Sequence, residues 1–142
     1  MKLVNGKITA AHILIVDDDK DIREALADGL ELPGISLTIT TAENAVTAIA
    51  NAMVTPPDVI ILDYNMPMGD GFSVAKEIRS NPRFKNTRII MLTAKDTQEN
   101  QWKSVDHDID AFLGKPFELA EVEAHIYGQL VTIQQGGRRR KI

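Results

Sequence analysis

A chain of 142 residues with a hydrophobic content of 44% is expected to fold as one domain, with no room for a second. The net charge is −4, and because residues 138–141 are all basic, the rest of the chain is more acidic than this value indicates. An acidic domain argues against nucleic acid as the main partner. The chain has no cysteine, which excludes disulfides, thiolate zinc sites and thiol catalysis. No apolar run approaches the roughly 20 residues of a membrane span and the first residues lack the apolar stretch of a signal peptide, so we expect a cytoplasmic protein without membrane contact.

Strands and helices alternate along the chain. Residues 1–11 show no sustained hydrophobic period, and we expect a loosely ordered lead-in there. Short apolar runs predict strands at residues 12–16, 59–62, 88–93 and 110–113, and alternation of apolar with polar residues predicts a less buried strand at residues 35–39. Apolar residues at helical spacing predict helices at residues 22–30, 42–53, 74–78, 97–105 and 119–130. We expect residues 131–142 to be a basic tail or the beginning of a linker. Alternating strands and helices indicate an α/β fold, a doubly wound parallel sheet with helices on both faces.

Residues with reactive side chains stand at the ends of the predicted strands. Asp17 and Asp18 follow the first strand, Asp63 follows the third, Thr93 ends the fourth, and Lys115 follows the fifth. Because the carboxyl ends of parallel strands lie at one edge of the sheet, these side chains are expected to converge. Three neighbouring carboxylates repel one another, and a divalent cation relieves the repulsion. Oxygen donors without cysteine or histidine favour Mg²⁺, and the set is typical of phosphoryl transfer.

Four motifs in this order resemble a known family. Val16–Asp19, Ile61–Pro67, Met91–Ala94 and Lys115–Phe117 are similar to the motifs of the receiver domain of two-component response regulators. The resemblance covers nearly the whole folded length and places a receiver domain at residues 12–130. It implies a flavodoxin-like sheet with strand order 2-1-3-4-5 and phosphorylation, in the presence of Mg²⁺, by a sensor histidine kinase or a phosphotransfer protein. It implies no enzyme activity beyond self-phosphorylation and self-dephosphorylation.

The resemblance also implies a role for each residue of the phosphorylation site. Asp63 would be the phosphoacceptor, which attacks a phosphohistidine of the partner. Asp17 and Asp18 would hold Mg²⁺, together with Asp63 and the backbone carbonyl of Asn65.

The remaining motif residues would contact the phosphoryl group or respond to it. Thr93 and Lys115 would bond the phosphoryl oxygens, and Phe112 would rotate inward as Thr93 shifts. The Lys115–Pro116 peptide bond would be cis. Asp19 has no role that the resemblance requires, and the cap of the following helix is the better interpretation.

Two features depart from the family pattern. The family often has Gly-Ala-Asp before the fifth strand, whereas residues 108–111 read Asp-Ile-Asp-Ala, and Phe112 lacks the hydroxyl of the commoner tyrosine. The five chemical positions are all retained, which argues against a degenerate receiver that is not phosphorylated. A Mg²⁺-dependent aspartate-nucleophile phosphatase of the haloacid dehalogenase type is a second alternative, but that family needs an acid where this chain has Asn65. A flavodoxin-like binding module is a third, but the acidic strand ends would repel a flavin phosphate.

We therefore predict a phosphorylation-dependent signalling switch, either a stand-alone receiver or the receiver part of a longer regulator. Its output would be a downstream protein target or a covalently linked output domain. The face formed by residues 97–130 is a candidate surface for homodimerisation.

Overall fold

The computed structural model describes residues 1–66, 71–94 and 109–136. Its strands are β1 (Lys2–Val4), β2 (Lys7–Val16), β3 (Ser36–Ala42), β4 (Val59–Asp63), β5 (Arg88–Thr93) and β6 (Ala111–Gly114). Its helices are α1 (Lys20–Gly29), α2 (Ala45–Val54), α3 (Gly71–Arg79) and α5 (Leu119–Gln134), with a 3₁₀ turn η1 at Pro82–Phe84. The helix predicted at residues 97–105 lies outside the described residues.

The sheet confirms the predicted fold class and strand order. Five parallel strands run in the order β3-β2-β4-β5-β6, which is 2-1-3-4-5 when the predicted strands are numbered along the chain. The register aligns Ile15, Ile61 and Ile90 in one row across β2, β4 and β5. Branched side chains at matching positions pack well on a pleated surface.

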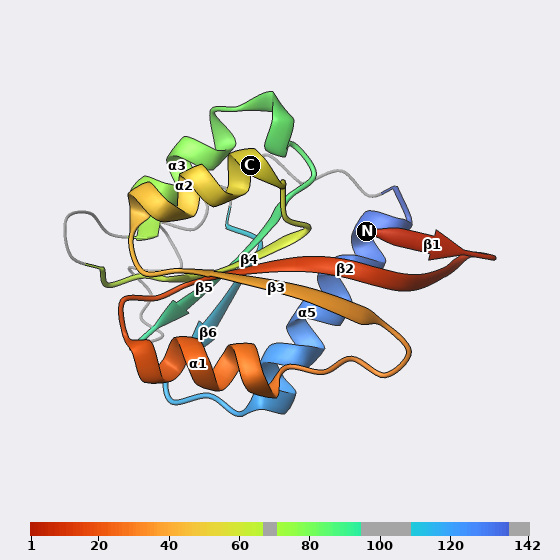
Figure 1. Cartoon of the computed structure of the whole chain (residues 1–142), viewed down its shortest axis with the longest axis horizontal. Helices are drawn as coiled ribbons and strands as arrows, with labels where there is room; N and C mark the ends of the chain where they lie inside the picture. The colour runs from red at the N-terminus through yellow and green to blue at the C-terminus, as the bar shows by residue number, and fades with distance from the viewer. Residues whose placement is uncertain (67–70, 95–108, 137–142) are drawn as a thin grey trace.

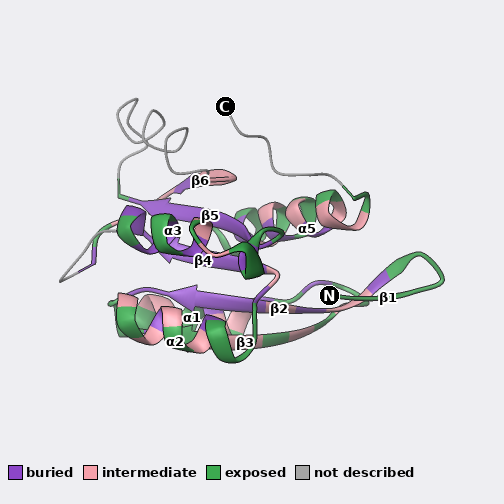
Figure 2. Cartoon of the chain, turned by 90° about the horizontal axis from the view of Figure 1, so that it is seen from above, coloured by how far each residue is buried: buried purple, intermediate pink, exposed green. Residues whose placement is uncertain are grey.

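Two hydrophobic layers fill the space between the sheet and its helices (Figure 1). One layer lies against α1 and α5 and includes Leu26 and Ile126, and the other lies against α2 and α3 and includes Ala48 and Ile78. Every residue of β4 and β5 is buried, as expected for central strands covered on both faces (Figure 2). In the described part of the chain, no helix is both long and apolar enough to cross a membrane.

The expectation of a loosely ordered lead-in at residues 1–11 is wrong. Residues 2–4 form β1 and residues 7–10 extend β2, and the two pair as an antiparallel hairpin. Asn5 and Gly6 have φ angles of 52° and 76°, and such a pair of left-handed residues makes the turn that suits a two-residue hairpin. Ala10 pairs with both Lys2 and Ser36, so β1 lies on the side of β2 opposite β3.

A bulge explains why the hydrophobic period of the first eleven residues is hard to see. Lys2 pairs with Ala10 but Leu3 pairs with Ile8, so one extra residue sits in β2. The shift turns Ile8 to the same face as Ala11, and both are buried in the layer under α5. A bulge interrupts the strict alternation of inward-facing and outward-facing residues along a strand. A search for a two-residue hydrophobic period therefore does not detect the strand.

The loop that departs from the family pattern carries a largely buried charge cluster at the amino ends of β5 and β6. Asp110 accepts a hydrogen bond from Arg79 at 3.0 Å and from the backbone N–H of Ile89 at 2.8 Å. The guanidinium of Arg88, whose side chain is 4% exposed, lies 3.7 Å from the same carboxylate. The cluster therefore joins α3 to two strands at the edge of the sheet opposite the acidic strand ends.

Candidate functional site

The carboxyl ends of the strands bring the predicted site residues together. Asp17 directly follows β2, Asp63 ends β4, Thr93 ends β5, and Lys115 follows β6. Asp17, Asp63 and Thr93 are buried, with exposures of 0%, 3% and 1%. Buried polar groups at the ends of aliphatic strands are held there by the sheet, because the hydrophobic residues before them fix the strand register.

Lys115 links the two buried carboxylates. Its Nζ lies 3.0 Å from Oδ1 of Asp63 and 3.2 Å from Oδ2 of Asp17. The backbone N–H of Lys115 donates to the carbonyl of Thr93 at 2.7 Å, which places the lysine beside the end of β5. Charge-assisted hydrogen bonds of this kind are the stronger ones in proteins, so the lysine holds both carboxylates in a defined arrangement.

Asp17, Asp18 and Asp63 form an acidic cluster whose ligand oxygens all lie within 4.8 Å of one another. Asp17 and Asp63 are buried while Asp18 is exposed. The cluster offers carboxylate oxygens alone, and hard oxygen ligands with an open, solvated side suit Mg²⁺, which retains several waters. The residues present therefore fit the metal that the sequence predicts.

Burial controls the charge state of Asp63. Desolvation, reinforced by the negative charge of Asp17, raises the pKa of Asp63 to about 6, even though the hydrogen bond from Lys115 acts in the opposite direction. Burial would lower the pKa of Lys115, but its hydrogen bond to Asp63 and the charges of Asp17 and Asp63 outweigh that effect and raise it. Without a cation, the site thus holds a charged lysine beside a carboxylate that is expensive to ionise.

Two predictions about local structure are confirmed. Asp19 caps α1, because its side chain accepts hydrogen bonds from the backbone N–H groups of Asp21 and Ile22. The Lys115–Pro116 peptide bond is cis.

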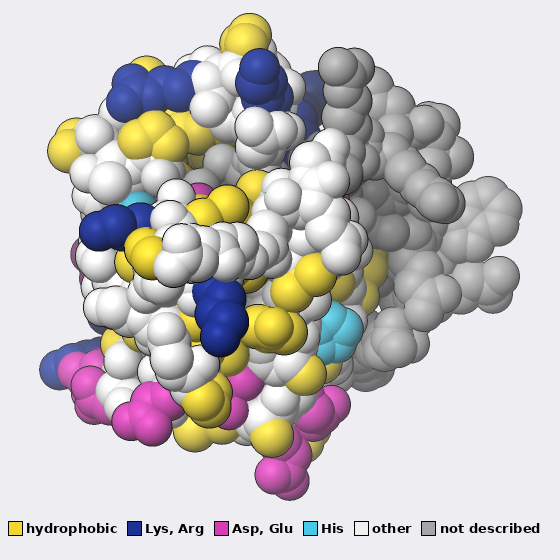
Figure 3. Space-filling model, turned by 90° about the vertical axis from the view of Figure 1, so that its right-hand side faces the viewer, with side chains coloured by type: hydrophobic (Ala, Val, Ile, Leu, Met, Phe, Trp, Pro, Cys, Tyr) yellow, Lys and Arg dark blue, Asp and Glu magenta, His cyan; other side chains and the backbone are white. Residues whose placement is uncertain are grey.

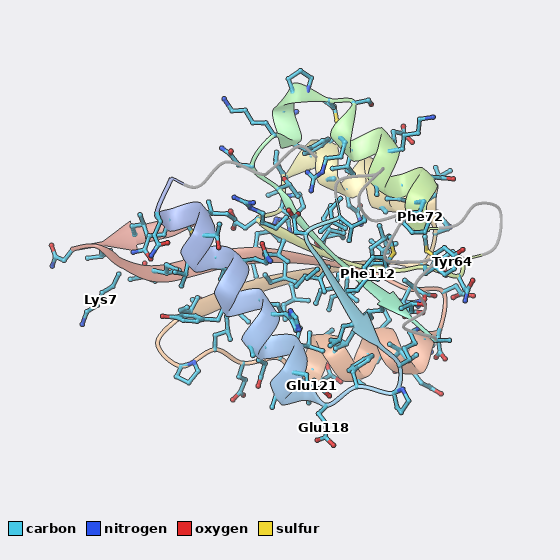
Figure 4. All side chains as sticks on the ribbon, turned by 180° about the vertical axis from the view of Figure 1, so that it is seen from behind. Lys7, Tyr64, Phe72, Phe112, Glu118 and Glu121 are labelled. Atoms are coloured by element: carbon cyan, nitrogen blue, oxygen red, sulfur yellow. The ribbon has the colours of Figure 1, made fainter. Side chains whose placement is uncertain are left out.

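The structure describes several, but not all, of the residues around the acidic cluster. The backbone N–H of Asn65 lies 3.4 Å from Oδ1 of Asp63. Tyr64 and Phe72 meet edge to face with ring centroids 5.1 Å apart, and Figure 4 shows them next to each other at one end of the sheet. Phe112 on β6 is half-buried against the layer that includes Phe72. Pro67 of the motif Ile61–Pro67 lies outside the described residues.

Sequence reasoning missed two residues that support the site. Arg23 donates to the backbone carbonyl of Asp17 at 2.8 Å, which ties α1 to the end of β2. Gly71 begins α3 so close to β4 that an added Cβ would lie 2.5 Å from the carbonyl oxygen of Asp63 and 2.8 Å from Sδ of Met91. The sequence does show a glycine eight residues after Asp63. Only the packing of α3 against β4, however, explains why a residue with a side chain does not fit there.

Comparison with known proteins identifies the family. The model of the response regulator receiver domain matches residues 13–127. The chain belongs to this family. Its receiver motifs, the acidic cluster and the observed strand order agree with the match, which confirms the resemblance drawn from the sequence.

The receiver has relatives among full-length regulators. It is 34% identical to the transcriptional regulatory protein PrrA of Mycobacterium leprae over 119 residues, which are 84% of this chain and 49% of PrrA. It is 35% identical to the response regulator MprA of Mycobacterium sp. (strain KMS) over 115 residues, which are 81% of this chain and 48% of MprA. The chain therefore spans about half the length of these curated relatives.

A solved structure matches over nearly its full length. The chemotaxis protein CheY4 of Vibrio cholerae is 31% identical, with a TM-score of 0.76 over 84% of this chain and 98% of that one. The receiver domain of the Francisella response regulator 1452 is 28% identical, with a TM-score of 0.75. These matches do not support the phosphatase alternative.

Proposed function

We propose that this receiver is switched by phosphorylation of Asp63. The observation that carries the proposal is the contact of one lysine with two buried carboxylates at the strand ends, beside a third carboxylate that is exposed. This arrangement presents a nucleophilic oxygen, a fixed positive charge and a set of metal ligands at the same edge of the sheet.

The proposed reaction transfers a phosphoryl group from a phosphohistidine of a partner protein. An oxygen of the ionised Asp63 attacks the phosphorus, the phosphorus–nitrogen bond breaks, and its electron pair stays with the imidazole, which takes up a proton. Lys115 already lies 3.0 Å from Oδ1 of Asp63, so its ammonium group is placed to bond an oxygen of the phosphoryl group on that carboxylate. The product is an acyl phosphate, whose hydrolysis returns the carboxylate.

Asp17, Asp18 and Asp63 are the proposed Mg²⁺ ligands, together with the backbone carbonyl of Asn65. When bound, Mg²⁺ would neutralise charge on the carboxylates and on the phosphoryl oxygens. The exposed Asp18 is the ligand that solvent and a donor protein reach first, while Asp17 is fixed by its bonds to Lys115 and to the backbone N–H of Asp19.

The proposed switch couples Thr93 to Phe112. Thr93 is buried at the end of β5, one strand away from Asp63, and its hydroxyl is the proposed donor to the phosphoryl group. Thr93 also pairs in register with Gly114, two residues after Phe112, so a shift of Thr93 acts directly on the strand that carries the aromatic ring. Movement of the half-buried Phe112 toward the core would change the surface that partners meet.

The proposed partners follow from the family. A sensor histidine kinase or phosphotransfer protein supplies the phosphoryl group, and a downstream protein or a covalently linked output domain receives the signal. We place the protein in the cytoplasm and propose no turnover of small phosphate esters, only gain and loss of its own phosphoryl group. The face of residues 97–130 stays a predicted surface for homodimerisation.

A chemical donor tests the proposal without a partner. Phosphoramidate carries the phosphorus–nitrogen bond of a phosphohistidine, so incubation with it and Mg²⁺ is expected to modify the receiver at one residue. Reduction of the acyl phosphate with borohydride, followed by peptide mass analysis, would assign the modification to Asp63. A modification at any other residue would contradict the proposed site, and steady release of phosphate from small esters would favour the phosphatase.

A further inference from the structure

Strand β3 forms one edge of the sheet. Among the described strands it pairs with β2 alone, and Figure 1 shows it at one side of the sheet. The backbone N–H of Asp17 bonds the carbonyl of Ala42, so the backbone of Ala42 is turned toward β2. Because the peptide groups of successive residues alternate in direction along a strand, those of Leu37, Ile39 and Thr41 face away from β2.

Two hydrogen bonds at the ends of β3 agree with this direction. Nδ2 of Asn51 on α2 donates to the carbonyl of Thr41 at 3.1 Å, and the N–H of Ile35 donates to the carbonyl of Leu32 at 3.0 Å. Between these two bonds, the outward N–H and C=O groups of β3 have no hydrogen-bond partner among the described residues. Such a row of backbone groups is a template for a further strand.

The sequence of β3 lacks the features that commonly protect the edge of a sheet. Ser36–Ala42 contains no charged residue, proline or glycine, and its register with β2 runs without a bulge. Natural proteins often block an edge strand with a lysine, a proline or a bulge. The outer side of β3 is therefore suited to strand addition, in which an extended peptide pairs with an exposed sheet edge.

An apolar groove lies beside this edge. It has a volume of about 830 Å³ and is bounded by α1, the loop after α1 and β3, with Leu30, Ile35, Leu37 and Ile39 among its lining residues. Leu37 and Ile39 are half-buried and pack against the hydrophobic layer under α1 and α5. A strand added to β3 would turn every second side chain toward this same face of the sheet, so apolar side chains at alternate positions would reach the groove.

Acidic side chains stand at both ends of the edge. Glu31 lines the groove before β3 begins, Glu43 directly follows the end of β3, and both are exposed. No lysine, arginine or histidine occurs in the sequence between Arg23 and Lys76. Figure 3 shows acidic side chains next to hydrophobic ones where α1 ends and α5 begins. Charge therefore favours a basic ligand and disfavours a second copy, since two such edges would bring their acidic ends together.

We propose that β3 accepts an extended segment of another protein as an additional strand, with apolar side chains at alternate positions and a lysine or arginine at each end. The outward peptide groups of β3 bond its backbone, the groove takes its apolar side chains, and Glu31 and Glu43 pair with its basic ends. The seven residues of β3 match a segment of about seven residues. This surface does not include Asp63, so the proposal does not depend on phosphorylation.

A designed peptide tests the strand addition. The probe is the end-blocked peptide Lys-Ile-Thr-Val-Thr-Ile-Lys, whose pattern is the same in both strand directions. Added to the ¹⁵N-labelled full chain, it is expected to shift the amide NMR signals of Leu37, Ile39 and Thr41 and to slow the hydrogen exchange of these amides at least about tenfold, because they then bond the added strand.

Methylated peptides test whether the backbone of the probe carries the binding. Methylation of the nitrogens of its apolar residues blocks one edge of the peptide, and methylation of its threonine nitrogens blocks the other. Only one edge of an added strand faces β3, so one of these two peptides should lose binding and the other should retain it.

Charge reversal tests the acidic ends. Glu31→Lys is expected to raise the dissociation constant of the probe about threefold to tenfold, because it replaces an attraction between exposed charges by a repulsion. The control variant Glu77→Lys makes the same change of net charge on α3 and should leave the binding unchanged. The double variant Glu31→Lys with Glu43→Lys should instead prefer a peptide with glutamate in place of both lysines. All three substitutions change exposed side chains, so circular dichroism should show an unaltered fold.

Several results would overturn the proposal. These are amide signals of β3 that do not move at millimolar peptide, the same response from both methylated peptides, and equal weakening in Glu31→Lys and Glu77→Lys. Signals of β3 that shift with protein concentration alone, without peptide, would show that a second copy occupies the edge and would also contradict the proposal.

Discussion

The raised pKa of Asp63 predicts that removing its charge stabilises the metal-free protein. Asp63→Asn keeps the size of the side chain and an oxygen that can accept from Lys115, but it abolishes ionisation. The pKa is about 6 in the folded chain against an ordinary value of 3.8, a shift of about two units. Each unit corresponds to about 1.4 kcal/mol, so the variant should be more stable by up to about 3 kcal/mol at pH 7.

The sign of the effect gives it a distinct pH dependence. Between pH 3.8 and about 6 the folded protein binds a proton at Asp63 that the unfolded chain does not hold. The stability that this proton contributes is fully present below pH 3.8 and is lost as the pH rises through about 6. The difference between wild type and Asp63→Asn should therefore be largest at neutral pH, small near pH 4 and absent well below pH 3.8.

Thermal unfolding in EDTA at several pH values measures this difference. For a domain of this size, about 3 kcal/mol corresponds to a difference in Tm of roughly 10 °C at pH 7. Mg²⁺ should narrow the gap, because it stabilises the ionised wild type through the three carboxylates. Equal stability of the two proteins in EDTA at pH 7, or a less stable variant, would refute the argument that burial dominates the charge state of Asp63.

Three further substitutions test contacts outside the phosphoacceptor, each by chemical denaturation. Gly71→Ala places a methyl group against backbone and should lower the free energy of unfolding by about 1–3 kcal/mol; a neutral effect would show that α3 moves away freely. Asp110→Ala leaves the buried Arg88 and the partly buried Arg79 without this carboxylate and should cost about 3–5 kcal/mol, far more than removal of an exposed acid such as Glu77. Asp19→Ala removes the cap of α1 and should cost about 1 kcal/mol, whereas Asp19→Asn should cost much less.

The central part of the fold could be predicted because burial on both faces leaves a plain signal. The strands predicted at residues 59–62 and 88–93 contain the unbroken apolar runs Val59–Leu62 and Ile89–Leu92, and the structure places them in the middle of the sheet as β4 and β5. The convergence of Asp17, Asp63 and Lys115 then follows from the rule that parallel strands end at one edge of the sheet.

The parts that sequence reasoning missed depend on local geometry or on packing between distant elements. The hairpin of β1 and β2 was hidden by a bulge, although Asn5-Gly6 is a strong hairpin signal that could have revealed it. The charge cluster around Asp110 could not be predicted from the sequence, because residues 79, 88 and 110 meet only when α3 packs on the sheet. No spacing in the sequence predicts such a contact.

The most direct test of the account is the intact mass of the protein after incubation with acetyl phosphate and Mg²⁺. The wild type should gain the mass of one phosphoryl group, while Asp63→Asn and a wild-type sample with EDTA should gain none. The Asp63→Asn protein is a sound control, because it is expected to be at least as stable as the wild type without metal. A gain that persists in Asp63→Asn, or no gain in the wild type under conditions that modify another receiver, would contradict the claim that Asp63 is the phosphoacceptor.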